Sequence, residues 1–191
     1  MDEVCFRDKR LAGSLDLFKH IHTFELDGNT SVFSAFNFLK ARQKLIGRKL
    51  SKLYIFCHGI TNSSSLTILG HTKKYDKYFT GKIQLGKEML TLSTVPNWIF
   101  IRNLVDNIIV YACMAGHTSK TRKGTIADGK MLMKLLAIKT NAYVYASERS
   151  QVYTPELMQF KKWEGRVYQF NPNGKIVQVS GGAVQALTGK I

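Results

Sequence analysis

The chain has 191 residues, of which 45% are hydrophobic and 11% aromatic, which suits one domain with a sizeable core and excludes a disordered chain. Lysine and arginine number 28 against 13 aspartates and glutamates, a formal net charge of +15 that attracts polyanions such as nucleic acid, anionic membranes or small polyphosphates. The three cysteines are too few for a disulfide framework, no apolar run approaches the roughly 18 residues of a transmembrane segment, and the N-terminal MDEVCFRDKR does not resemble a secretory signal peptide. We therefore expect a reducing compartment, the cytoplasm or a host cell into which the protein is delivered without such a signal.

The N-terminal half alternates between strand and helix patterns. In chain order we expect a strand at 15–26, a turn at 27–29, a helix at 30–50, a strand at 52–59 and short strands or a hairpin at 66–92. Thr30 or Ser31 can cap the helix.

The C-terminal half continues the alternation. We expect a helix at 94–107, a buried strand at 108–113, an amphipathic helix at 124–141, a buried strand at 142–147 and a hairpin at 166–179. The inward face of the helix at 124–141 is predicted to consist of Met131, Leu132, Leu135 and Leu136. Continuous apolar strands suit a sheet that is covered on both faces. The sequence therefore predicts a single α/β domain, a three-layer sandwich with a mainly parallel central sheet, a core at about 50–150 and a C-terminal β-hairpin at 165–180.

Two of the apolar strands end in residues with chemical potential. The run LYIFCHG presents His58 before Gly59, and IIVYAC ends in Cys113 before a short turn. Neighbouring parallel strands place their carboxyl ends side by side, so this histidine and this cysteine can approach each other. An imidazole beside a thiol lowers the thiol pKa and relays protons, and backbone amides near Gly59 and Cys113 could stabilise an oxyanion.

Each of these residues also has a structural interpretation. Cys113 alone would more often be a buried strand cysteine, and Cys57, which faces away from His58, is predicted to be a core residue. A zinc set of Cys57, His58, Cys113 and His117 lacks the usual knuckle spacings, so we expect no metal. Asp128 is predicted to cap the following helix.

The order of His-Gly at one strand end and Ala-Cys about 55 residues later resembles the caspase-like cysteine peptidases. This clan includes caspases, gingipains, separase, CHAT-domain proteases and the self-cleaving domains of bacterial toxins. The segment YACMAG lacks the glutamine before and the arginine after the cysteine that caspases have, and the chain looks closest to the CHAT and toxin branches.

The resemblance implies a cysteine endopeptidase that acts on a protein or peptide and needs no cofactor, with Cys113 as nucleophile and His58 as general acid and base. It implies a substrate pocket formed by Ser147, Glu148 and Gln151, where Glu148 either receives a basic side chain or pairs with Arg149 or a nearby lysine. The toxin branch further implies activation by inositol hexakisphosphate, for which Lys120, Arg122 and Lys123 are the candidate anion ligands; the alternative is that these side chains are dispersed in solvent.

Two other functions compete with this one. A catalytically silent caspase-like domain could bind a host or partner protein. A nucleic-acid binder would use the positive charge, but the aromatic residues fall mostly in apolar runs instead of an exposed stacking row, which disfavours nucleic acid as a partner.

Overall fold

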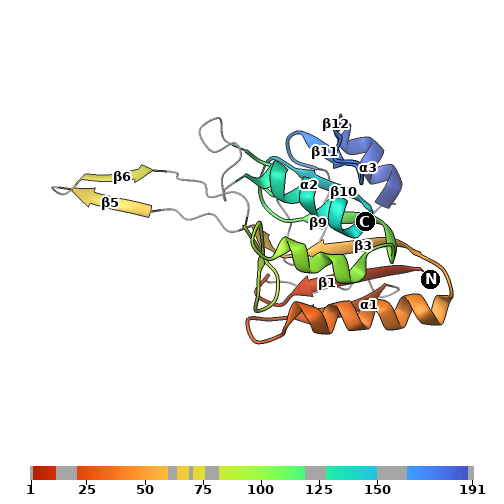
Figure 1. The fold of residues 1–191 in the computed structure, drawn as a ribbon. Coiled ribbons are helices and arrows are strands. Elements are labelled where there is room, and N and C mark those ends of the chain that lie inside the picture. The colour runs from red at the N-terminus through yellow and green to blue at the C-terminus, as the bar shows by residue number, and fades with distance from the viewer. Residues whose placement is uncertain are drawn as a thin grey trace.

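The computed structural model of the protein describes residues 2–11, 21–59, 64–68, 71–75, 82–118, 128–149 and 163–188. Its centre is a seven-stranded sheet in the order β12-β11-β10-β9-β3-β1-β2 (Figure 1). The strands are β1 (Glu3–Asp8), β2 (His22–Leu26), β3 (Leu50–Phe56), β9 (Val105–Tyr111), β10 (Tyr143–Ser147), β11 (Val167–Phe170) and β12 (Ile176–Val179). From β2 to β10 all neighbours are parallel, and β11 and β12 join as an antiparallel hairpin. The predicted α/β class, mainly parallel sheet and C-terminal hairpin are confirmed.

Helices cover both faces of this sheet (Figure 1). The helices on one face are α1 (Val32–Ile46), the 3-10 helix η2 (Val95–Ile101) and α2 (Gly129–Thr140). On the opposite face, α3 (Gly181–Thr188) packs through the buried Val184. The arrangement is compatible with the expected three-layer sandwich.

The two faces of the sheet have different cores. Under the helices, aliphatic strand residues pack against Phe36 and Trp98. The rings of these two residues lie edge to face, with 5.1 Å between their centroids. The other face carries a row of aromatic rings from β3, β9 and the segment before β11. Phe56 stacks on Tyr111 with 4.8 Å between ring centroids, and Tyr111 stacks on Trp163 with 4.7 Å between centroids. We call Tyr54, Phe56, Tyr111 and Trp163 the aromatic row.

The residues between β3 and η2 form short strands, as the sequence predicts. One sheet contains β4 (His58–Gly59), β7 (Lys82–Gln84) and β8 (Leu90–Thr91), and the other is the hairpin of β5 (Ser64–Ile68) and β6 (His71–Tyr75). Because β4 follows β3 after a single residue, the chain leaves the central sheet at Cys57.

The helix α1 has the cap that the sequence predicts, but it ends at Ile46, four residues before the predicted end. The Ser31 hydroxyl accepts a hydrogen bond from the Phe33 amide, and Gly47 ends the helix in the left-handed conformation at φ 76°. The Glu88 carboxylate completes the cap by accepting hydrogen bonds from the Ser31 hydroxyl at 2.6 Å and the Val32 amide at 2.8 Å. Although burial acts to raise the pKa of Glu88, these bonds outweigh it and the pKa is lowered. This cap ties the segment before β8 to the helix layer.

The helix α2 has its predicted cap, but the face that it turns to the core differs from the prediction. The Asp128 side chain accepts a hydrogen bond from the Met131 amide, which confirms the capping role. The predicted inward position of Met131 is wrong, since its side chain is 36% exposed. The buried positions are spaced three to four residues apart from Leu132 and Met133 onward, and include Leu136.

Two elements differ from the sequence prediction. The helix predicted at 94–107 is a 3-10 helix that ends at Ile101, because Asn103 adopts a positive φ of 63° and β9 begins at Val105. The strand β1 has no counterpart in the predicted elements, although it lies between β2 and β3.

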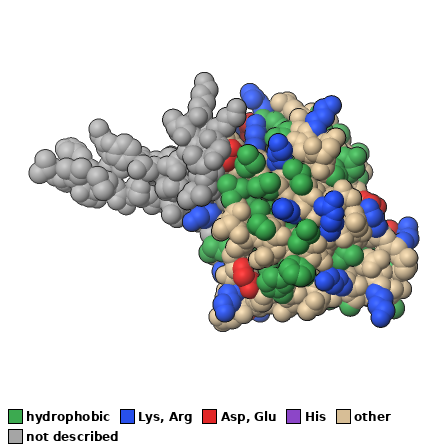
Figure 2. Space-filling view, viewed as in Figure 1, with side chains coloured by type: hydrophobic (Ala, Val, Ile, Leu, Met, Phe, Trp, Pro, Cys, Tyr) green, Lys and Arg blue, Asp and Glu red, His purple; other side chains and the backbone are tan. Residues whose placement is uncertain are grey.

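The helices α1 and α2 carry basic side chains but no acidic ones. The helices α1, η2 and α2 contain no aspartate or glutamate, while α1 and α2 contain the basic residues Lys40, Arg42, Lys44, Lys130, Lys134 and Lys139. Figure 2 shows lysine and arginine side chains over this face, with apolar side chains between them. We call these six residues the helical cations.

Candidate active site

The register of β3 and β9 relates the two candidate catalytic residues. Leu53 lies opposite Ile108 and Phe56 opposite Tyr111, a constant separation of 55 residues. The same separation relates His58 to Cys113, and the ladder extends toward them because the Cys57 amide donates to the Tyr111 carbonyl at 3.3 Å. The two residues thus follow neighbouring parallel strands at matching positions, although Cys113 lies two residues beyond the end of β9.

The residues that precede the two candidate catalytic residues have matching surroundings. Cys57 and Ala112 belong to the core under the helices, whereas Phe56 and Tyr111 belong to the aromatic row. The two strands therefore end in the same phase, one residue before Cys57 and one residue before Ala112.

A close contact between β4 and the cysteine turn fixes this arrangement. A Cβ atom placed on Gly59 would lie 1.8 Å from the Cys113 carbonyl oxygen, 2.8 Å from its carbonyl carbon and 3.1 Å from its amide nitrogen. Such distances are far inside van der Waals contact, so glycine is required here. The structure thereby brings Gly59 and Cys113 together, and His58 is the residue next to this contact in the sequence.

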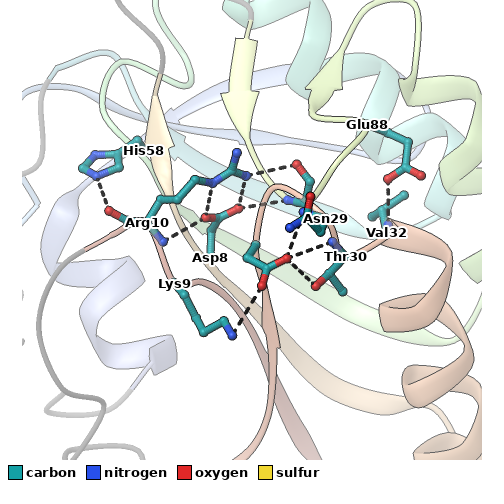
Figure 3. Close-up of polar contacts among 10 residues, drawn as sticks. Asp8, Lys9, Arg10, Asn29, Thr30, Val32, His58 and Glu88 are labelled. Carbon is teal, nitrogen blue, oxygen red and sulfur yellow. Dashed lines mark hydrogen bonds and ion pairs between the residues drawn. The ribbon is translucent and has the colours of Figure 1, made fainter.

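The imidazole of His58 is exposed and oriented by a backbone carbonyl (Figure 3). Its Nε2 lies 3.1 Å from the carbonyl oxygen of Arg10. Since a carbonyl can only accept, Nε2 carries the proton in this hydrogen bond. In the neutral ring Nδ1 is then unprotonated and can act as a base.

The Arg10 carbonyl belongs to a network that centres on Asp8 (Figure 3). The Asp8 carboxylate is completely buried and accepts hydrogen bonds from the Arg10 amide at 3.1 Å, Arg10 Nε at 2.7 Å and the Gly86 amide at 2.9 Å. Arg10 Nη2 also bonds to Asp8 and donates to the Gly86 carbonyl at 3.0 Å. Hydrogen bonding to Asp8 raises the pKa of Arg10. Sequence reasoning missed this network, because DKR at 8–10 has the appearance of a solvated charge run.

The three free cysteines differ in burial. Cys113 is half-buried, whereas Cys5 and Cys57 are buried. Burial raises the pKa of the Cys57 thiol, and the Asp8 carboxylate and Cys113 raise it further. Burial likewise raises the pKa of Cys5. The predicted core role of Cys57 is confirmed, and Cys113 is the thiol best placed to react.

The end of β10 holds the turn that follows Cys113. The Met114 amide donates to the Arg149 carbonyl at 3.0 Å, and the Gly116 amide donates to the Ser147 carbonyl at 2.7 Å. Met114 adopts a positive φ of 56°, so this turn is sharp. Gly59 of β4 and the end of β10 therefore both contact the cysteine turn.

The predicted pocket residues are partly described. The Ser147 hydroxyl is buried and already bonded, to the Glu164 carbonyl and the Arg149 amide. Glu148 accepts a hydrogen bond from the Tyr168 hydroxyl at 3.1 Å, and among the described residues it pairs with Arg166 at 3.6 Å. Gln151 and the predicted anion ligands Lys120, Arg122 and Lys123 lie outside the described residues.

The zinc set that the sequence disfavours, Cys57, His58, Cys113 and His117, is not assembled among the described residues. In the part of the chain that the structure describes, no three histidine, cysteine, aspartate or glutamate side chains form a metal-binding group. The backbone of His117 instead bonds to Met114 and to Gly129 at the start of α2. None of the helices in the described ranges has the length and apolarity that a membrane crossing requires.

Comparison of the chain with protein-family models, curated proteins and solved structures finds no match. The functional assignment therefore rests on the geometry of the site.

Proposed function

We propose that the protein is a cysteine endopeptidase of caspase-like fold, with Cys113 as the nucleophile and His58 as the general acid and base. The observation that carries the proposal is the shared register of 55 residues, which sets both residues at adjacent strand ends next to the Gly59 contact. The orientation of His58 by the Arg10 carbonyl and the half-buried state of Cys113 support it.

In the first half-reaction, His58 Nδ1 takes the thiol proton of Cys113. The thiolate sulfur attacks the carbonyl carbon of the scissile peptide and forms a tetrahedral oxyanion. Backbone amides near Gly59 and Cys113 would stabilise that oxyanion, which remains a prediction from the sequence. The imidazolium returns its proton to the leaving amine as the peptide C–N bond breaks, and a thioester remains on Cys113.

In the second half-reaction, neutral His58 takes a proton from water. The resulting hydroxide equivalent adds to the thioester carbonyl, and the C–S bond breaks to release the carboxylic acid product. The imidazolium returns its proton to the leaving sulfur, which restores the Cys113 thiol and neutral His58. The Nε2 hydrogen bond to Arg10 persists in both protonation states, because this nitrogen is a donor in the neutral Nε2–H tautomer and in the imidazolium.

The substrate would lie near the end of β10, whose backbone holds the cysteine turn. A basic substrate side chain would compete with Arg166 for Glu148, and the long 3.6 Å ion pair leaves room for that exchange. Glu148 is thus the proposed specificity residue.

The test is labelling of the full chain with a fluorescent peptidyl electrophile, together with cleavage of a peptide library. The expected result is that Cys113→Ala abolishes labelling and that His58→Ala slows it by roughly a hundredfold or more, the usual contribution of general base catalysis. The matched controls are Cys57→Ala and His22→Ala, a buried thiol and an exposed histidine remote from the site, which should both retain labelling.

Labelling that persists in both Cys113→Ala and His58→Ala would refute the assignment. Labelling of Cys113 that is indifferent to His58, with no cleavage of any peptide, would instead favour the catalytically silent binding domain.

A further inference from the structure

We infer that Asp8 and Arg10 form a positioning unit for His58, which fixes the Arg10 carbonyl and so holds the imidazole with Nε2 protonated and Nδ1 free. The inference rests on the proposed function for the role of His58 as a base. It assigns a task to a buried carboxylate that the proposed chemistry does not itself use.

Residue 10 is held at both its backbone and its side chain. The Arg10 amide and Nε both donate to Asp8 Oδ1, and Nη2 bonds to Oδ2 (Figure 3). The turn is closed by the Leu11 amide, which donates to the Asp8 carbonyl at 3.0 Å. The Arg10 carbonyl is thereby fixed between two restrained residues, and it is the atom that meets His58.

The unit is also joined to the connection between β7 and β8 through Gly86. Gly86 contributes its amide to Asp8 and its carbonyl to Arg10, although it lies more than 70 residues away along the chain. The position tolerates only glycine: φ is +66°, and an added Cβ would lie 2.8 Å from the Thr30 carbonyl oxygen. The unit is therefore anchored to the connection between β7 and β8, which pairs with β4 through β7.

The Asp8 carboxylate is a buried charge, and its main contribution is to geometry. A buried ion pair adds little to stability compared with apolar residues of similar size, but its hydrogen bonds specify one geometry. Around this carboxylate the bonds from Arg10 and Gly86 define that geometry, and the neighbouring Cys57 thiol, whose pKa is raised, stays neutral beside it. What the charged pair adds is a defined direction for the Arg10 carbonyl.

Asp27 provides a matched control. It lies at the same edge of the sheet and also accepts hydrogen bonds from two amides and a hydroxyl, those of Asn29 and Thr30. Its ion pair with Lys9 is 3.4 Å long. The hydrogen bonds of Asp27 do not lead to the carbonyl that contacts His58, although its charge acts on Arg10. Asp27→Asn therefore removes a nearby negative charge while it leaves the hydrogen bonds between Asp8, Arg10 and Gly86 in place.

The experiment measures the ring nitrogens of His58 by nuclear magnetic resonance in the full chain labelled with ¹⁵N-histidine, at a pH where the ring is neutral. His58→Ala assigns the signals. We expect the wild type to show the Nε2–H tautomer, Asp8→Asn and Arg10→Gln to show a mixture of tautomers, and Asp27→Asn to match the wild type. Alkylation of Cys113 should fall about 100-fold in the first two variants, the cost of a misplacement on the order of 1 Å.

Three results would overturn the inference: an Nδ1–H tautomer in the wild type, a wild-type tautomer in both unit variants, or an equal change in Asp27→Asn. Should Asp8→Asn fail to fold, Arg10→Gln decides, because the Arg10 side chain is 30% exposed and its loss leaves the core intact. The tautomer is read without turnover, so a failed peptidase assignment would appear separately, as the expected tautomers without His58-dependent alkylation.

Discussion

At the scale of single residues, Gly59 is the position where a small change should have the largest effect. Its missing side chain leaves space for the Cys113 peptide, and Gly59→Ala would place a carbon 1.8 Å from that carbonyl oxygen. The backbone must move, so we expect a loss of about 1–3 kcal/mol in the free energy of unfolding and a displaced, slowly alkylated Cys113. Urea denaturation and alkylation rates measure the two effects.

The control is Gly182→Ala in α3, where an added Cβ meets nothing within 4 Å. That variant should be as stable as the wild type or slightly more so, since alanine favours a helix. Equal stability of Gly59→Ala and Gly182→Ala would contradict the close contact.

The cysteines give a second residue-scale prediction. In the native protein, iodoacetamide should modify Cys113 first, because Cys5 and Cys57 are buried and burial raises the pKa of both thiols. Peptide mass spectrometry over time should find Cys5 and Cys57 modified only once urea unfolds the chain. Modification of Cys57 as fast as that of Cys113 without urea would show that the turn opens readily.

At the scale of elements, the turn from β2 to α1 depends on an ionised carboxylate. The Thr30 hydroxyl and the Asn29 amide donate to Asp27 and lower its pKa from 3.8 to about 2. The ionised form therefore stabilises the folded state above pH 3.8, and this contribution is lost as the pH falls toward about 2.

Asp27→Asn should consequently lose less stability between pH 4 and pH 2 than the wild type, because the amide does not titrate. Urea unfolding of both proteins across that range of pH provides the measurement. Parallel stability curves would mean that this turn does not contribute to the acid sensitivity.

The elements also show which features a sequence reveals. His58 and Cys113 could be paired in advance because each follows an unbroken apolar run, and such runs form adjacent parallel strands. The sequence does not predict the strand β1, because EVCFRD is short and has charged residues at both ends. Its Asp8 is bonded by Gly86 from a remote connection as well as by Arg10, and no local pattern encodes the first of these contacts.

The inward face of α2 is predicted incorrectly for a different reason. The apolar residues from Met131 to Leu136 are nearly continuous, so several faces satisfy a helical period. Packing against η2 and β10 selects the face with Met133 and leaves Met131 toward solvent.

At the scale of the whole molecule, the charge is spread over more than one region. The helical cations lie among helices without carboxylates, and Lys120, Arg122 and Lys123 follow the cysteine turn in the sequence. We expect inositol hexakisphosphate to raise the melting temperature at low salt through general attraction, and the shift to shrink as salt screens it.

Two triple variants distinguish general attraction from a dedicated site. Changing Lys120, Arg122 and Lys123 to alanine should reduce the shift as much as changing Lys40, Lys44 and Lys134 to alanine, because each removes three positive charges. Loss of the shift in the first variant alone would instead identify an activator site beside the cysteine turn.

The pairing of β4 with β7 has a consequence for how this molecule could be altered. Gly59 lies opposite Ile83, so the chain departs for residue 60 and returns at residue 82 through one hydrogen-bonded neck. Doubling a loop costs only about 0.6 kcal/mol in closure entropy, so we expect added length between these points to leave the pairing of β4 with β7 in place. A recognition peptide or a small folded module inserted there would stay attached beside the proposed catalytic pair and could direct it to a chosen target.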